Sequence, residues 1–178
     1  VIGVGGIGLN VISGAALAGA ERIVAVDLSD EKLELAKRFG ATHAVNGGTG
    51  DPIAEVQEIT GGGADHAFEA IGLPATTTQA LRMTRVGGQV LLIGLQRPGS
   101  SMEIAMMDDV ITPQRTVKGV FMGSANIKRD IPKYAELYLQ GRLDLDDLIS
   151  QEISGNEIDD AYERMKGGQV ARTVVTRW

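Results

Sequence analysis

The chain has 178 residues, of which 43% are hydrophobic and 24 are glycine, enough for one ordinary domain or for one domain plus a piece of another. Its net charge is −6 and its basic residues are scattered, which disfavours binding to nucleic acid or to an anionic membrane. The absence of cysteine, of an apolar run of about 18 residues and of a signal peptide excludes disulfides, thiolate-bound metal and a membrane span within the chain, and we expect a cytoplasmic protein.

Strand and helix patterns alternate through the first two thirds of the chain. We predict strands at 1–4, 22–27, 42–45, 65–70, 89–94 and 116–122. We predict helices at 6–20, 31–39 (capped by Asp30), 52–60, 75–85 and 106–111. Such alternation predicts βαβ units with right-handed crossovers, and hence an α/β fold with a doubly wound, six-stranded parallel sheet.

The alternation ends after Met122. We predict a helix from Asp130, as its cap, to Gln140, then a strand at 148–153. A further helix starts at Ser154 or Asn156 and is stopped by Gly167 and Gly168, and a last strand covers 170–176. We therefore divide the chain into residues 1–123, which form the sheet, and residues 124–178, which we expect to dock elsewhere.

The first eight residues, VIGVGGIG, contain Gly3, Gly5 and Gly8 in the spacing G-x-G-x-x-G. In a dinucleotide-binding loop the first glycine permits the tight turn, the second lets a pyrophosphate approach the backbone, and the third lets helix and strand pack closely. The helix N-terminus then offers free N–H groups to the phosphates. Only two residues precede Gly3, and no initiator methionine is present, so we expect the first strand to be truncated.

Asp27 lies 24 residues after Gly3, at the end of the predicted second strand. A carboxylate there can accept hydrogen bonds from both ribose hydroxyls of an adenosine and repels a 2′-phosphate, which favours NAD over NADP. The alternative is an acid that merely ends the strand or caps the next helix. Lys32 can reach back to the same ribose, and its alternative is a solvated surface lysine.

Other candidate side chains have simpler interpretations. His43 and His66 lie in or beside predicted strands without a second metal ligand at suitable spacing, so we expect both to be structural. Asp65 and Glu69 flank one strand, and we expect packing or turn roles for them. Met106 and Met107 fit an interface or a core better than a cofactor site.

Five segments together resemble one family, in the same order and over essentially the whole chain: GVGGIGLN, RIVAVDLSDEKLELAKRFGATHAVN, FEAIG, VKGVFMGS and GGQVARTVV. They are similar to the zinc-dependent medium-chain alcohol dehydrogenases. The resemblance implies a Rossmann cofactor domain followed by a C-terminal α+β segment that completes a catalytic domain. It also implies that the zinc ligands belong to an N-terminal part, so that this chain contains no catalytic or metal-binding residue.

The same resemblance implies a role for each matching residue. The pyrophosphate loop is formed by Gly3, Gly5, Gly6, Ile7 and Gly8, and the Ile7 side chain lies against the nicotinamide. The adenosine ribose is held by Asp27 and Lys32, and the pyrophosphate is reached from the tail by Arg172. The crevice is lined by Ile71 and Gly72, the carboxamide is bound by backbone groups of Ile93, Val120 and Met122, and Leu95 faces the substrate pocket.

The implied activity is oxidation of a small alcohol to an aldehyde or ketone by hydride transfer to NAD, with zinc bound outside this chain, which alone is inactive. Two alternatives stay open. One is an NAD-sensing regulatory module, and the other is a zinc-free quinone reductase relative, whose usual NADPH preference Asp27 opposes. We also expect a homo-oligomer, a dimer or tetramer, formed through the sheet edge near Met102 and Thr116.

Overall fold

The computed structural model describes residues 1–166 and 171–178. Its main sheet contains two parallel ladders. In one, β1 (Val24–Asp27) pairs with β2 (His43–Asn46). In the other, β4 (Thr84–Leu92) pairs with β3 (Ala64–Glu69) on one side and with β5 (Thr116–Gly119) on the other.

Ile2 joins the two ladders into one sheet. It forms parallel bridges to Val26 of β1 and to Glu69 of β3. Its own N–H donates to the Phe68 carbonyl at 2.8 Å, and the next N–H, of Gly3, donates to the Val26 carbonyl at 2.8 Å. The order is therefore β2-β1-Ile2-β3-β4-β5. The predicted parallel α/β fold is confirmed, whereas the strand predicted at 1–4 is reduced to these bridges.

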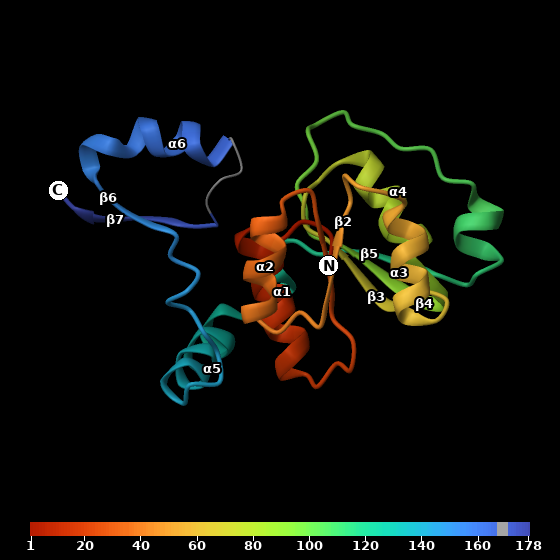
Figure 1. Cartoon of the computed structure of the whole chain (residues 1–178), viewed down its shortest axis with the longest axis horizontal. Helices are drawn as coiled ribbons and strands as arrows, with labels where there is room; N and C mark the ends of the chain where they lie inside the picture. Colours follow the sequence, from red (N-terminus) through yellow and green to blue (C-terminus); the bar gives the residue numbers. More distant parts are fainter. Residues whose placement is uncertain (167–170) are drawn as a thin grey trace.

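Helices cover both faces of the sheet, as a doubly wound fold requires (Figure 1). On one face, α1 (Gly6–Leu17) and α2 (Asp30–Arg38) bury a cluster that includes Leu9, Ile12 and Phe39. On the other, α3 (Pro52–Thr60) and α4 (Pro74–Met83) bury Val56 and Leu81. The strand β1 is buried over Val24, Ala25 and Val26 because both of its faces are covered.

Two predicted helix starts are wrong. The cap of α2 is Ser29, whose side chain accepts from the Lys32 N–H, so Asp30 is the first helical residue. Likewise α5 (Ile127–Leu139) starts before Asp130. The Asp130 carboxylate instead reaches back to the N–H of the cap residue Asn126, at 2.8 Å, and binds Arg129. In α5 an acid of the first helical turn thus accepts the N–H of the cap residue, whereas α2 has a serine cap.

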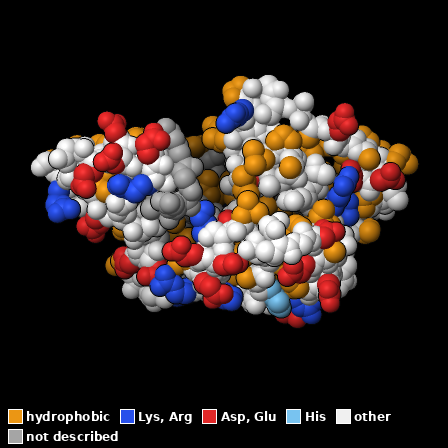
Figure 2. Space-filling view, turned by 45° about the horizontal axis from the view of Figure 1, so that its top comes forward, with side chains coloured by type: hydrophobic (Ala, Val, Ile, Leu, Met, Phe, Trp, Pro, Cys, Tyr) orange, Lys and Arg blue, Asp and Glu red, His pale blue; other side chains and the backbone are white. Residues whose placement is uncertain are grey.

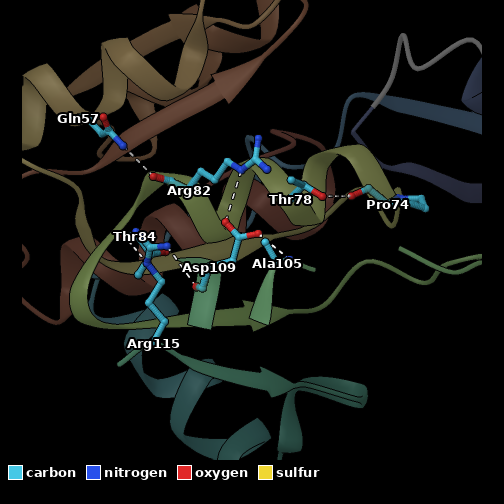
Figure 3. Close-up of polar contacts among 8 residues, drawn as sticks. All are labelled: Gln57, Pro74, Thr78, Arg82, Thr84, Ala105, Asp109 and Arg115. Carbon is cyan, nitrogen blue, oxygen red and sulfur yellow. Dashed lines mark hydrogen bonds and ion pairs between the residues drawn. The ribbon is translucent and has the colours of Figure 1, made fainter. Parts of the chain in front are cut away.

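Residues 102–115 form no strand. They contain the π-helical turn η1 (Met106–Ile111), which is held against α4 and the start of β4 by buried Asp109 (Figure 3). The Asp109 carboxylate lies 3.5 Å from Arg82 Nε, and Arg115 Nε donates to the Thr84 carbonyl at 2.8 Å. Burial lowers the pKa of Arg115, and the charge of Asp109 opposes that shift. The expected contact through the sheet edge near Met102–Thr116 stays a prediction, and the strand at that edge is β5, whose four residues are exposed.

The turn η2 (Met122–Ser124) leads into the C-terminal part, whose first helix is α5. A second, two-stranded parallel sheet follows, in which β6 (Gln151–Ser154) pairs with β7 (Thr173–Arg177). Between them lie η3 (Gly155–Glu157) and α6 (Ile158–Lys166). In Figure 1, β6, α6 and β7 gather at the end of the molecule where α1 and α2 lie. The predicted stop at Gly167 and Gly168 and the predicted strand start at 170 lie outside the described residues. No helix in the described ranges is long and apolar enough to cross a membrane.

Leu148 attaches this C-terminal part to the sheet part. Its side chain is 2% exposed and belongs to the same buried cluster as Leu9, Ile12 and Phe39 of the α1 and α2 face. An ion pair of 3.2 Å between Arg38 of α2 and Asp147 lies beside it on the surface. Because exposed ion pairs contribute little, we assign most of the attachment to the buried leucine.

Leu148→Ala is expected to lower the free energy of unfolding by about 2–5 kcal/mol, since it leaves a cavity in a packed cluster. The measurement is urea unfolding followed by circular dichroism. Leu139→Ala, at a side chain that is 83% exposed, is the matched control and should change stability by less than about 0.5 kcal/mol. Equal effects of the two substitutions would contradict the attachment.

Candidate functional site

The candidate site is a cleft at the carboxyl end of the parallel strands, where ligands bind in doubly wound folds. Its volume of about 1820 Å³ exceeds the roughly 300–1,000 Å³ of ordinary small-molecule pockets and leaves room for an extended ligand. In Figure 2 the surface is hollowed between the C-terminal part and the larger part of the molecule. Both parts line the cleft, and its walls include Gly3, Gly5, Asp27, Lys32, Ile71, Ser150 and Ala171.

The glycine loop meets two different requirements. Gly3 has a φ of +87°, and a Cβ at Gly8 would lie 1.9 Å from the Gly3 carbonyl oxygen, so the fold itself requires both glycines. Gly5 is different, because its φ is −85° and a Cβ there would meet no atom of the described residues within 4 Å, its own chain neighbours aside. The space over Gly5 is thus open toward the cleft.

The first turn of α1 has free donors. Gly5 is the cap residue and provides no side-chain cap, and the first turn contains no acidic residue. By contrast, the start of α2 is capped by Ser29 and that of α3 by Asp51. A 12-residue helix with unpaired N–H groups at its start attracts an anion, as the sequence predicts for the amides of Gly6 and Ile7.

Arg172 lies beside this helix start. Its Nη2 is 3.9 Å from the position that a Cβ on Gly6 would take, and the carbonyl oxygen of Ala171 is 2.7 Å from that position. The guanidinium makes no hydrogen bond or ion pair with the part of the chain that the structure describes. The structure therefore brings the tail arginine and the glycine loop together, although 166 positions separate Gly6 from Arg172 in the sequence.

The Asp27 carboxylate has a second role that the sequence did not reveal. Its Oδ2 accepts the Val4 N–H of the glycine loop at 2.8 Å. Its Oδ1 accepts the N–H groups of Leu28 at 2.8 Å and Ser29 at 3.2 Å. These bonds fix the carboxylate and leave about one of its roughly four acceptor positions for a ligand. Lys32 lines the same cleft, and its ammonium makes no hydrogen bond or ion pair within residues 1–166 and 171–178.

Glu69 supports the neighbouring turn. It is 1% exposed, and its Oε1 accepts the N–H groups of Ile71 at 2.9 Å and Gly72 at 2.8 Å and the Thr76 hydroxyl at 2.8 Å. Ile71 in turn abuts the glycine loop, since a Cβ on Gly3 would lie 2.4 Å from Ile71 Cγ1. Glu69 therefore supports the turn at Ile71 and Gly72, and through Ile71 it also supports the glycine loop. Gly72, with a φ of +88°, fits closely against residues 94–95.

Backbone groups of Ile93, Val120 and Met122 lie where β4 and β5 end. The N–H of Ile93 donates to the Glu69 carbonyl and that of Val120 to the Leu92 carbonyl. The carbonyl oxygens of Ile93 and Val120 accept no hydrogen bond from the described chain. Met122 has a φ of +50°, a strained conformation for a residue with a side chain, and strain of this kind clusters at functional sites. The side chains of Ile7, Leu95 and Met122 are all exposed.

The contacts of the two histidines are structural ones. His43 Nδ1 lies 2.9 Å from the Thr42 hydroxyl, and the His66 ring stacks on Phe68 at a centroid distance of 6.5 Å. Asp65 binds Arg85, which lowers the pKa of that carboxyl. Over the described ranges, no three His, Cys, Asp or Glu side chains group in a way that could hold a metal ion.

Comparisons with known proteins agree on one family. The family model described as zinc-binding dehydrogenase matches residues 6–140. An alcohol dehydrogenase class-3 of Cereibacter sphaeroides is 38% identical over 98% of this chain and 48% of its own length. An S-(hydroxymethyl)glutathione dehydrogenase of Paracoccus denitrificans is 35% identical over 98% of this chain and 48% of its own length. The chain thus spans about half the length of these curated relatives.

A solved structure gives the same result. The crystal structure of benzyl alcohol dehydrogenase from Acinetobacter calcoaceticus superimposes with a TM-score of 0.94 at 32% identity. The match covers 99% of this chain and 48% of that one. The C-terminal part is therefore included in the similarity, as well as the parallel sheet.

Glu69→Ala should lower the free energy of unfolding by about 2–4 kcal/mol, because it leaves two backbone donors of a buried turn without an acceptor. Glu69→Gln keeps a carbonyl oxygen at the same place and should lose less than half of that. Thermal and urea unfolding of the two variants give the comparison. If alanine were as stable as glutamine, the turn would not depend on this acceptor.

Proposed function

Because the chain belongs to the zinc-binding dehydrogenase family, we propose that it is the NAD-binding portion of a zinc-dependent alcohol dehydrogenase. In this proposal residues 1–123 form the cofactor domain and residues 124–178 complete a catalytic domain. The observation that carries the proposal is the convergence of three features: an α1 start without a side-chain cap, the open space over Gly5, and an Arg172 guanidinium that has no partner among the described residues.

These features fit a pyrophosphate. Its oxygens would accept the free N–H groups of the α1 start at Gly6 and Ile7, with Gly5 giving backbone access. Arg172 would approach the same phosphates from the tail, where a planar guanidinium can donate two parallel hydrogen bonds. Gly3 and Gly8 would act through the shape of the loop.

The other end of the cleft fits an adenosine with a free ribose. Asp27 is held with an acceptor position available, and the Lys32 ammonium lies on the same wall. Further acids line this cleft: Glu31, Glu34, Asp146 and Asp147. Glu34 and Asp147 are paired with Lys37 and Arg38, and Asp27, Glu31 and Asp146 provide the negative charge that disfavours the extra phosphate of NADP and supports NAD as the cofactor.

The backbone at the ends of β4 and β5 fits a carboxamide. Two free carbonyl acceptors, of Ile93 and Val120, suit the amide NH2 group, and the N–H of Met122 suits its oxygen. Ile7 would press on the nicotinamide, Ile71 and Gly72 would line the crevice, and Leu95 would face the substrate. NAD, when bound, supplies a hydride acceptor for an alcohol carbon.

We place the zinc site of the enzyme outside this chain. The sequence has no cysteine, and the part of it described here contains no group of three potential ligands. In this proposal the ligands of the zinc come from outside residues 1–178. The small alcohol that the family relationship implies as substrate is likewise proposed for the whole enzyme.

Association through the sheet edge is part of the same proposal. The outer edge of β5 is unpaired, and its residues, Thr116 to Gly119, are all exposed. An exposed strand edge pairs readily with a second copy. We accordingly place the expected dimer contact at β5.

The chain is expected to bind NADH more tightly than NADPH in a fluorescence titration. Asp27→Gly should reduce the difference in binding free energy between NADH and NADPH by about 1–3 kcal/mol, the scale of hydrogen bonds to a charged group. The reason is that the substitution removes both the ribose acceptor and the repulsive charge. Because Val4 also loses its acceptor, the variant should be less stable, and Asp27→Asn is the control that keeps one oxygen. Tighter binding of NADPH by the unmodified chain would contradict the assignment.

A further inference from the structure

Ser150 is hydrogen-bonded to the backbone of the tail arginine, Arg172. It immediately precedes β6, and its Oγ accepts the N–H groups of Ala171 at 3.0 Å and Arg172 at 3.4 Å. In return, the Ser150 N–H donates to the Arg172 carbonyl at 2.9 Å. Both peptide groups that flank the Arg172 Cα are thus bonded to one residue.

Ser150 is itself fixed from the other side. Leu148, two residues earlier, is buried in the cluster under α1 and α2, and Ala171 packs partly against that cluster. The Ala171 carbonyl oxygen lies 2.7 Å from the position of a Cβ on Gly6, so the tail crosses directly over the start of α1. A contact chain therefore runs from the core through Leu148 and Ser150 to the backbone of Arg172.

We propose that Ser150 is a positioning residue that holds Arg172 over the α1 start, where the guanidinium meets the pyrophosphate of the cofactor. The proposal rests on the proposed function, since it concerns the same cofactor site. Ser150 does not touch the phosphate in this account. Its hydroxyl orients the peptide groups of Ala171 and Arg172 and so reduces the number of directions in which a long, otherwise unpaired arginine side chain can point.

The expected consequence is a loss of affinity limited to ligands with a pyrophosphate. Ser150→Ala in the full 178-residue chain should raise the dissociation constants of NADH and ADP-ribose by about two- to tenfold, the effect of one or two exposed hydrogen bonds. The dissociation constant of adenosine should not change, because Arg172 does not reach it. Ser150→Thr, which keeps the hydroxyl, should restore the NADH affinity.

A double-mutant cycle separates positioning from a general structural role. Arg172→Gln should weaken NADH binding more than Ser150→Ala does, and the double variant should bind NADH as Arg172→Gln alone does. Ser101→Ala, at an exposed serine without a hydrogen-bond partner in the described chain, is the matched control. Unfolding midpoints of all variants show whether the fold is kept.

Several results would overturn the role of Ser150: an unchanged NADH affinity in Ser150→Ala, an equal loss for adenosine, or effects of Ser150→Ala and Arg172→Gln that multiply. Failure of the unmodified chain to bind NADH would instead overturn the proposed function, and the role of Ser150 with it. A measurement of NADH binding by the unmodified chain therefore distinguishes the two failures.

Discussion

The central constraint on this structure is the joint at Ile2. The ladders β1-β2 and β3-β4-β5 are not paired with one another directly, and a single residue bridges both of them. The glycine loop leaves the sheet at that joint, so the carboxyl ends of β1 and β3 are brought to either side of it. Asp27 then binds the loop through the Val4 N–H, and Glu69 supports the turn that abuts Gly3. The position of the loop therefore depends on sheet pairing and on two buried or half-buried carboxylates, in addition to its glycines.

The C-terminal part contributes to the same site through packing. Leu148 is buried among residues of α1 and α2, and this burial carries Ile149 and Ser150 to the cleft. Hydrogen bonds from Ser150 then align the tail beside the helix start. A helix N-terminus alone is a weak anion site, and a second positive group strengthens it. The tail supplies that group from a different part of the fold, which agrees with a similarity to solved structures that covers both parts.

Sequence periodicity predicted the elements of the sheet part well, because alternating apolar strands and amphipathic helices have distinct patterns. The spacing of the glycines and of Asp27 predicted a cofactor loop with an acid beside it. These patterns could not predict that Asp27 binds Val4, that Ser150 meets Arg172, or that Leu148 fills the α1 and α2 core, since these contacts depend on chain segments far apart in sequence. The cap of α2 was misplaced by one residue because Ser29 and Asp30 are both good cap residues. The edge strand was predicted at 116–122 and is observed as β5 at Thr116–Gly119, so only its end differs.

We infer that the open space over Gly5 is needed for ligand binding and is not needed for folding. The most direct measurement is NADH binding together with urea unfolding of Gly5→Ala. A Cβ at this position meets no atom of residues 1–166 and 171–178 within 4 Å, its chain neighbours aside, and the φ of −85° is allowed for alanine. The free energy of unfolding should therefore change by less than about 1 kcal/mol, the usual effect of alanine at a helix cap, while NADH affinity falls by at least about tenfold. Unchanged NADH affinity in a folded Gly5→Ala chain would contradict the account.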